Sequence, residues 1–285
     1  MPKSSYRRFA SVFHPTDFSK SSQVAFDHAL KIALGNSSFF DVLHVGGKDG
    51  RGPDWSGFPQ VRDTLVRWDL LQAESPRTAV ADELGVNVRK VKLGSKAPLA
   101  AMTDFLDNEL ADLIVLATEG RDGLPRWLNP SVSERLARRS RTPTLFVPAG
   151  AAGFVSHEGG GVNLKRVLVP VDRKPDPQVA IDTAGVLLRS LGAKEAEVEA
   201  LFIGESAQMP RVAPPKGGDG AFRQTARRGT ASDDIVKTAK KDGVDLIVMA
   251  TEGHNGFLDV LRGSTTERVL RRSPCPLLAV PAAHG

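Results

Sequence analysis

The chain of 285 residues carries one sequence pattern twice, and this repeat constrains its fold more than any other feature. Residues 111–148 align without a gap to residues 244–281, and about half of the paired positions are identical. A second match joins residues 11–29 to residues 166–184. A unit repeated at this length predicts two similar domains.

Short apolar runs alternate with segments whose apolar residues recur at helical spacing. Strands are predicted at 10–15, 39–45, 86–93, 112–117 and 144–148, and again at 166–171, 197–203, 245–250 and 277–281. Helices are predicted at 23–34, 61–84 (interrupted near Pro76), 99–110 and 132–140, and again at 178–191, 231–242 and 265–273. Fully apolar strands that alternate with helices indicate parallel sheets covered on both faces. The predicted fold class is therefore α/β, with two doubly wound parallel-sheet domains.

The domain boundaries follow from the repeat. Residues 1–149 form the first predicted domain and residues 163–285 the second, and the Gly-rich residues 150–162 are predicted to be a flexible linker. The second copy is shorter, because residues 209–222 are too rich in Pro and Gly for a helix. A lid and a simple deletion both remain open for residues 204–222.

Composition excludes several classes of protein. The single cysteine, Cys275, rules out an intrachain disulfide and a multi-cysteine metal site, and its apolar surroundings predict a small buried side chain. No apolar run approaches the roughly 20 residues that span a bilayer, and the N-terminus lacks a secretory signal, so a cytoplasmic protein is expected. The net charge of +5 is modest, and no zinc-finger or RNA-binding signature accompanies it, so nucleic acid and membrane are not expected partners.

Four segments of the second copy resemble the universal stress protein family. They are VPVD (169–172), DLIVMATEG (245–253), GS followed by TTERVL (263–270), and PCPLLAVP (274–281). The resemblance covers essentially the whole chain as a tandem pair. It implies a Rossmann-like, adenine nucleotide α-hydrolase-like domain of about five strands in each copy. It also implies association through the last strands, which are TLFVP (144–148) and LLAVP (277–281) here, either within one chain or in a homodimer.

In some members of this family ATP lies at the carboxyl edge of the sheet, and the resemblance transfers that site residue by residue. The family signature is glycine, two residues, glycine, nine residues, glycine, then Ser or Thr. Gly253, Gly263 and Ser264 match it, whereas Ala250 replaces the first glycine. The implied nucleotide-binding residues of the second copy are Pro170, Val171, Asp172, Met249, Ala250, Gly253, Gly263, Ser264, Thr265 and Thr266. Magnesium is expected only as the companion of ATP.

The first copy matches this site less well. Its weaker equivalents are Asp17, Gly120 and Ser131, while Ala117 and Pro130 replace two glycines. Proline has no backbone N–H and cannot adopt a positive φ, so the loss of glycine at position 130 impairs a phosphate cradle. ATP binding is therefore expected in the second domain rather than the first.

A purely structural interpretation competes with the nucleotide site. Ser264 with Glu267, and Ser131 with Glu134, each form a capping box that satisfies the first amides of a helix without a ligand. Asp17 and Asp172 are equally able to cap the helices that follow them. His14 is expected in the core or at a strand edge rather than at a metal site.

Three functions follow from these observations. The leading hypothesis is a tandem universal stress protein, a non-enzymatic cytoplasmic stress-response module with ATP in the second domain. The first alternative is a protein-interaction module that binds no nucleotide. The last is a slow ATPase in which Glu252 acts on a bound triphosphate.

Overall fold

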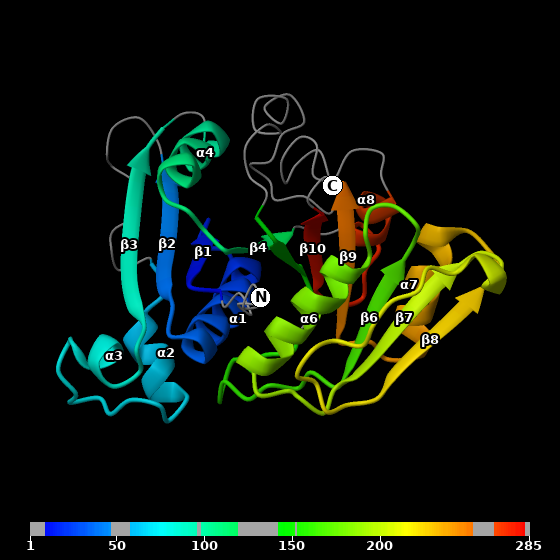
Figure 1. Cartoon of the computed structure of the whole chain (residues 1–285). Helices are drawn as coiled ribbons and strands as arrows, with labels where there is room; N and C mark the ends of the chain where they lie inside the picture. Colours follow the sequence, from blue (N-terminus) through cyan, green and yellow to red (C-terminus); the bar gives the residue numbers. More distant parts are fainter. Residues whose placement is uncertain are drawn as a thin grey trace, which may run out of the picture.

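The computed structural model describes residues 9–46, 58–95, 98–118, 142–151, 153–252 and 265–282, whose strands form one ten-stranded sheet. The strand order is β3-β2-β1-β4-β5-β10-β9-β6-β7-β8 (Figure 1). The strands of the first copy are β1 (Ser11–Pro15), β2 (Phe39–Gly46), β3 (Asn87–Gly94), β4 (Leu113–Thr118) and β5 (Thr144–Pro148). Those of the second are β6 (Arg166–Val171), β7 (Glu197–Ile203), β8 (Phe222–Arg227), β9 (Leu246–Glu252) and β10 (Leu277–Ala282).

Each copy contributes five parallel strands in the same order, which confirms the predicted doubly wound fold. The two halves meet at β5 and β10, which pair antiparallel with Leu145 opposite Leu278. The predicted association of the two last strands within one chain is therefore confirmed. This pairing covers the edges of β5 and β10, which would otherwise be free to pair with a strand of another chain.

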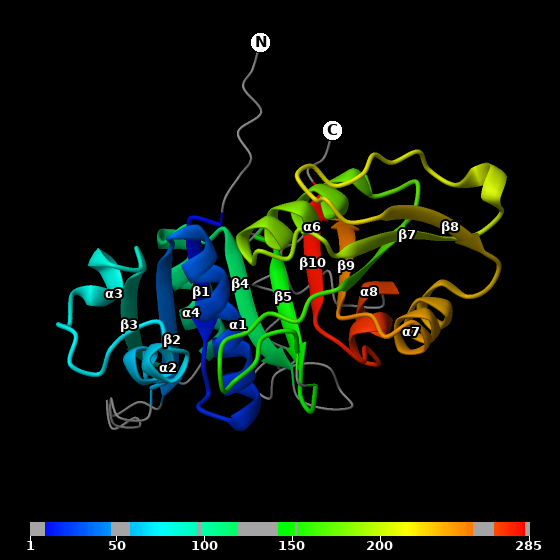
Figure 2. The same cartoon turned by 90° about the horizontal axis from the view of Figure 1, so that it is seen from below.

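Helices cover both faces of the sheet. They are α1 (Lys20–Asn36), α2 (Val61–Arg67), α3 (Ala79–Asp82), α4 (Pro98–Asn108), α6 (Gln178–Ser190), α7 (Ala231–Lys241) and α8 (Thr265–Leu270), with a 3-10 turn η2 (Ser206–Gln208). One core cluster joins the sheet to α1 and α6 through residues such as Phe26 and Ile181. A second cluster on the other face joins it to α4, α7 and α8, and Figure 2 shows α6 and the α7–α8 pair on opposite sides of the second half.

The helix predictions agree with the structure except where turn residues intervene. The helix expected over 61–84 is divided into α2 and α3, because the chain turns after Trp68 and again before Pro76. The helix expected at 132–140 lies outside the described residues. Strand β8 was not predicted from the sequence, because its residues FRQTAR are mostly polar and show no apolar run.

The prediction of a flexible linker is wrong for residues 153–162. This segment is a hairpin closed by the bridge between Val155 and Val162, and Phe154 and Val155 are buried. The Phe154 amide donates to His28 Nε2 at 3.0 Å. Gly153 and Gly160 have positive φ angles, and a Cβ on Gly160 would lie 2.4 Å from the Trp68 ring. These two glycines therefore permit close packing on the first copy.

The shortened region of the second copy is an extended segment that lies along α6. Gln178 exchanges hydrogen bonds with the backbone of Ala213, accepting from its N–H at 2.8 Å and donating to its oxygen at 3.3 Å. Farther along the helix, Arg189 donates to the Lys216 carbonyl oxygen. The segment thus connects η2 to β8, whereas the first copy has helices α2 and α3 at the corresponding position.

Candidate nucleotide site at the carboxyl ends of β6 and β9

The strand order of the second copy reverses between β6 and β9. These neighbours pair in parallel at Val167 with Leu246 and at Leu168 with Ile247, and this ladder ends there although the strands continue to Val171 and Glu252. Their carboxyl ends therefore diverge. In open α/β sheets this point of reversal is where ligands bind.

Asp172 directly follows β6 at this edge. Its carboxylate is exposed, and Oδ1 accepts a hydrogen bond from the Arg173 amide at 2.7 Å. Helix α6 begins at Gln178, whose amide donates to Asp176 Oδ1. The interpretation of Asp172 as a helix cap is therefore wrong, and its Oδ2 has no hydrogen-bond partner among the described residues.

The apolar residues assigned to the site lie in or beside the core. Val171 and Met249 are buried and pack on opposite faces of the sheet. Pro170 and Ala250 are half-buried.

Thr265 and Thr266 open helix α8. Thr265 is half-buried and Thr266 is buried. Gly253, Gly263 and Ser264 lie outside the described residues. Ser264 is one of the two members of the predicted capping box. Its other member, Glu267, accepts hydrogen bonds from Arg271 Nε and Nη2 at 3.1 and 2.8 Å.

Thr251 was not predicted as a site residue. It is 4% exposed at the carboxyl end of β9, and its hydroxyl is buried without a hydrogen-bond partner among the described residues. The sequence offered one signal for it, a hydroxyl residue within the apolar run LIVMATE. Thr118 stands at the equivalent end of β4 and is also buried.

The first copy shows the same divergence of strands. β1 and β4 pair at Val12 with Leu113 and at Phe13 with Ile114, and not beyond. Asp17 is exposed, and its Oδ1 accepts from the amide of Ser19, which is itself the N-cap of α1. The cap interpretation is therefore wrong for Asp17 as well.

The remaining first-copy candidates, Gly120 and Ser131, lie outside the described residues. Pro130, Glu119 and Glu134 lie there too. Ala117 is half-buried near the end of β4 and packs against the core.

His14 and Cys275 are both buried in the core, as predicted. His14 is fully buried, Nδ1 donates to the Val115 carbonyl oxygen at 2.9 Å, and burial lowers the pKa of the ring to about 4. Cys275 is buried, and burial raises the pKa of its thiol to about 12. Within the described ranges no cluster of three or more His, Cys, Asp or Glu residues could hold a metal ion.

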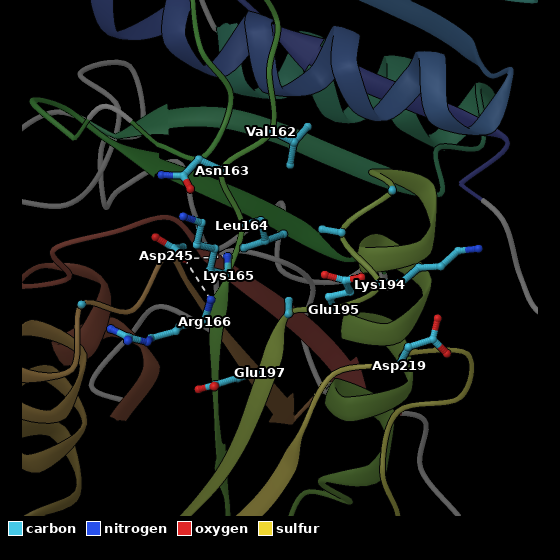
Figure 3. Close-up of a pocket in the computed structure, with 14 residues that line it drawn as sticks. Val162, Asn163, Leu164, Lys165, Arg166, Lys194, Glu195, Glu197, Asp219 and Asp245 are labelled. Carbon is cyan, nitrogen blue, oxygen red and sulfur yellow. Dashed lines mark hydrogen bonds between the residues drawn. The ribbon is translucent and has the colours of Figure 1, made fainter.

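A polar cavity of about 860 Å³ lies at the opposite edge of the second copy (Figure 3). Arg166 and Glu197, the first residues of β6 and β7, line it, together with Lys194 and Asp245. Asp245 Oδ2 accepts from the amides of Lys165 and Arg166 at 2.8 and 2.9 Å. The cavity is thus an amino-edge feature, separated from Asp172 by the length of β6.

Over the described part of the chain, no helix has the length and apolar character needed to cross a membrane.

Known structures share this arrangement. A universal stress protein from Archaeoglobus fulgidus superposes with a TM-score of 0.59 at 19% identity, over 97% of this chain and 100% of that one. A putative universal stress protein from Pseudomonas aeruginosa superposes with a TM-score of 0.55 at 15% identity, over 97% and 95% of the two chains. At these identities the likeness concerns the fold.

Sequence comparison connects the chain to a family. A universal stress protein of Methanocaldococcus jannaschii is 29% identical over 140 residues, which cover 49% of this chain and 82% of that relative. A universal stress protein A homolog of Coxiella burnetii is 40% identical over 58 residues, or 20% and 40% of the two chains. The profile of the universal stress protein family matches residues 9–148 and 193–281. The chain therefore belongs to the universal stress protein family, with a match in each of its two copies.

Proposed function

We propose that this protein is a cytoplasmic stress-response module that binds ATP in its second domain, between the carboxyl ends of β6 and β9. The observation that carries the proposal is the position of Asp172. Its carboxylate is exposed beside two strands that have ceased to pair, and it caps no helix. A carboxylate placed there is available to accept hydrogen bonds from a nucleoside hydroxyl group.

Positive charge supports an anionic ligand at this edge. Arg173 and Lys174 follow Asp172 directly, and both are exposed. Arg173 Nε donates to the Gln208 carbonyl oxygen at 3.4 Å, and its guanidinium makes no other hydrogen bond to the described residues. Cations at the strand edge raise the local concentration of a triphosphate. The phosphate cradle itself is assigned to Gly253, Gly263 and Ser264 from the sequence.

The two copies differ in the features that this proposal uses. Phe18 and Ser19 occupy the positions that correspond to Arg173 and Lys174, and Pro130 stands where the second copy has Gly263. The first copy therefore lacks cations at these two positions and lacks the glycine of the assigned phosphate cradle. We expect one ATP per chain.

Isothermal titration calorimetry with MgATP tests the proposal. Asp172→Ala is expected to weaken binding about tenfold or more, because a hydrogen bond to a charged group is lost. Gly263→Pro, which copies the first-copy loop, is expected to abolish binding. Asp17→Ala is the matched control and should leave both affinity and stoichiometry unchanged. A wild-type protein that gives no binding heat and displaces no fluorescent ATP analogue would refute the proposal.

A second candidate function is an interaction module that binds no nucleotide. Ala250 favours it, because its methyl group stands where the family signature has glycine. Ala250→Gly separates the two functions: tighter ATP binding indicates a narrowed nucleotide site, whereas an inert Ala250→Gly protein indicates that the site has been lost. The cytoplasmic location stays a prediction, which fractionation of cells that express the tagged full chain tests.

A further inference from the structure

His157 and Asp27 form a histidine–carboxylate pair outside the candidate nucleotide site. Asp27 lies on α1 and is buried, whereas the His157 side chain, in the hairpin between the two copies, is 49% exposed. His157 Nδ1 lies 2.7 Å from Asp27 Oδ2, and Gln23 Nε2 donates to Oδ1 at 3.1 Å. A carboxylate only accepts hydrogen bonds, so Nδ1 carries the ring proton and donates it to Asp27. The lone pair of the neutral ring is therefore on Nε2.

The Nε2 atom of His157 is accessible. It has no hydrogen-bond partner among the described residues, and about half of the side chain is exposed. The other histidines of the described ranges, His14, His28 and His44, are buried. A carboxylate that accepts from one ring nitrogen fixes the tautomer and raises the basicity of the other nitrogen. His157 Nε2 is thus oriented as a nucleophile.

Holding a segment against the first helix of a copy does not require an imidazole. In the second copy Gln178 donates to Asp182 at 3.0 Å, and Gln178 binds the crossing segment through the backbone of Ala213. The described contacts of that crossing include no histidine. In the hairpin, the backbone oxygen of His157 already accepts from Trp68 Nε1 at 2.9 Å. An exposed imidazole held by a buried carboxylate is therefore more than the crossing needs.

Two cations lie beside the hairpin at His157. Arg67 Nε donates to the His157 backbone oxygen at 3.0 Å. Lys31 Nζ lies 5.7 Å from the centroid of the Trp68 ring, whose Nε1 donates to the same oxygen. The acidic neighbour Glu158 is exposed, so solvent and salt screen its charge. Cations near a nucleophile attract an anionic electrophile, and arginine donors bind phosphoryl oxygens well.

We propose that His157 Nε2 accepts a phosphoryl group from a small acyl phosphate. The Nε2 lone pair forms a bond to phosphorus, the bond from phosphorus to the acyl oxygen breaks, and the carboxylate leaves with that electron pair. The ring keeps its Nδ1 proton, and the positive charge that develops on it faces the Asp27 carboxylate. Asp27 is thus a positioning residue. The reaction is independent of the proposed nucleotide site, so either can fail without the other.

The experiment uses acetyl phosphate as the probe and the purified full chain. Intact mass measures the label, peptide mapping places it, and NMR shifts of phosphorus and the ring nitrogens distinguish attachment at Nε2 from attachment at Nδ1. We expect one acid-labile phosphoryl group on His157 Nε2. It should form about tenfold faster than on the same residue of the urea-unfolded chain, where neither Asp27 nor Arg67 is in place.

Four variants and controls test the assignment. His157→Gln keeps a donor for Asp27 and should abolish the label. Asp27→Asn keeps the shape and an acceptor oxygen, and should slow labelling about tenfold, while hydrogen exchange at the Phe154 amide reports whether the hairpin stays closed. Asp182→Asn is the matched change in the second copy and should react at the wild-type rate.

Three results would overturn the proposal. They are attachment at Nδ1, a folded-state rate no faster than that of the unfolded chain, and an Asp27→Asn rate equal to wild type. If Asp27→Asn opens the hairpin, the attachment site and the comparison with the unfolded chain decide the outcome in the wild-type protein.

Discussion

His157 Nδ1 lies 2.7 Å from Asp27 Oδ2, and this contact fixes the hairpin between the two copies to helix α1. Asp27 is buried, and Gln23 donates to its other oxygen at 3.1 Å. The backbone oxygen of His157 accepts in turn from Trp68 Nε1 at 2.9 Å. The hairpin therefore bridges α1 and the end of α2.

The second copy repeats half of this arrangement. Gln178 donates to Asp182 at 3.0 Å, with the same spacing on the equivalent helix, and Gln178 also holds the backbone of Ala213. Each copy thus uses a Gln and an Asp one helical turn apart where another segment crosses its first helix. Asp27 is the more buried of the two aspartates.

Removing the Asp27 carboxylate should loosen the hairpin. We expect Asp27→Ala to lower the free energy of unfolding by about 2 kcal/mol, because it leaves Gln23 and His157 without an acceptor. Urea unfolding measures the loss, and hydrogen exchange should speed up at the Phe154 amide. Asp182→Ala is the matched control and should cost clearly less. Equal losses in the two variants would contradict a special role for the hairpin contact.

Stability should fall as the pH drops below neutrality. Burial lowers the pKa of His14 and His28 to about 4 from 6.5, so both rings are neutral in the folded protein. Because the unfolded chain takes up these protons near pH 6.5 and the folded protein only near pH 4, the free energy of unfolding is highest above pH 6.5 and falls as the pH drops toward 4. The loss is on the order of 3 kcal/mol per ring at most. Burial raises the pKa of Asp27, which acts in the opposite sense and offsets part of this loss.

Urea unfolding at pH 7, 6 and 5 measures this dependence, and ring NMR shifts report each histidine. Both rings should remain neutral through pH 5. A ring that titrates near 6.5, or an unfolding free energy that does not change over this range, would contradict the assignment.

Helix α1 should tolerate no side chain at Gly35. A Cβ there would lie 1.8 Å from the Ser190 carbonyl oxygen of α6, so the two helices pack with direct backbone contact. Glycine-to-alanine changes within helices usually stabilise, but Gly35→Ala should destabilise by about 2 kcal/mol through overpacking. Gly185→Ala provides the control, because its Cβ would meet the nearest atom at 3.1 Å. Thermal unfolding that ranks Gly35→Ala as the more stable variant would refute this packing.

The Arg89–Asp41 pair should stabilise the outer part of the first copy. Arg89 Nε lies 2.7 Å from Asp41 Oδ1, and Asp41 is buried while Arg89 is about half exposed. Arg89→Ala leaves a buried carboxylate unpaired, and we expect it to cost about 2 kcal/mol in urea unfolding. Glu109→Gln removes the exposed partner of the same guanidinium and should change little. A comparable loss in Glu109→Gln would show that the exposed ion pair matters equally.

Much of the fold could be predicted from the sequence because it depends on local patterns. Short apolar runs such as LIVMAT and LLAVP favour buried strands, and the repeat indicates the same topology for both copies. The pairing of TLFVP with LLAVP followed from the family resemblance. Strand β8 could not be predicted from its mostly polar residues FRQTAR, because its extended conformation depends on pairing with β7.

The candidate site divides in the same way. The sequence by itself placed Asp17 and Asp172 after equivalent strands, and it showed that Gly263 is present where the first copy has Pro130. Only the tertiary structure decided that neither aspartate caps a helix, because the turn after each strand aims the carboxylate at the nearby amide of Ser19 or Arg173 rather than at the first turn of the helix. It also decided that the Thr251 hydroxyl is buried with no hydrogen-bond partner among the described residues, because burial depends on elements far apart in the sequence. The linker gives the clearest contrast. Its glycines suggested flexibility, but Phe154, Val155 and the contact between His157 and Asp27 hold it in place, and those contacts exist only once α1 and α2 have packed on the sheet.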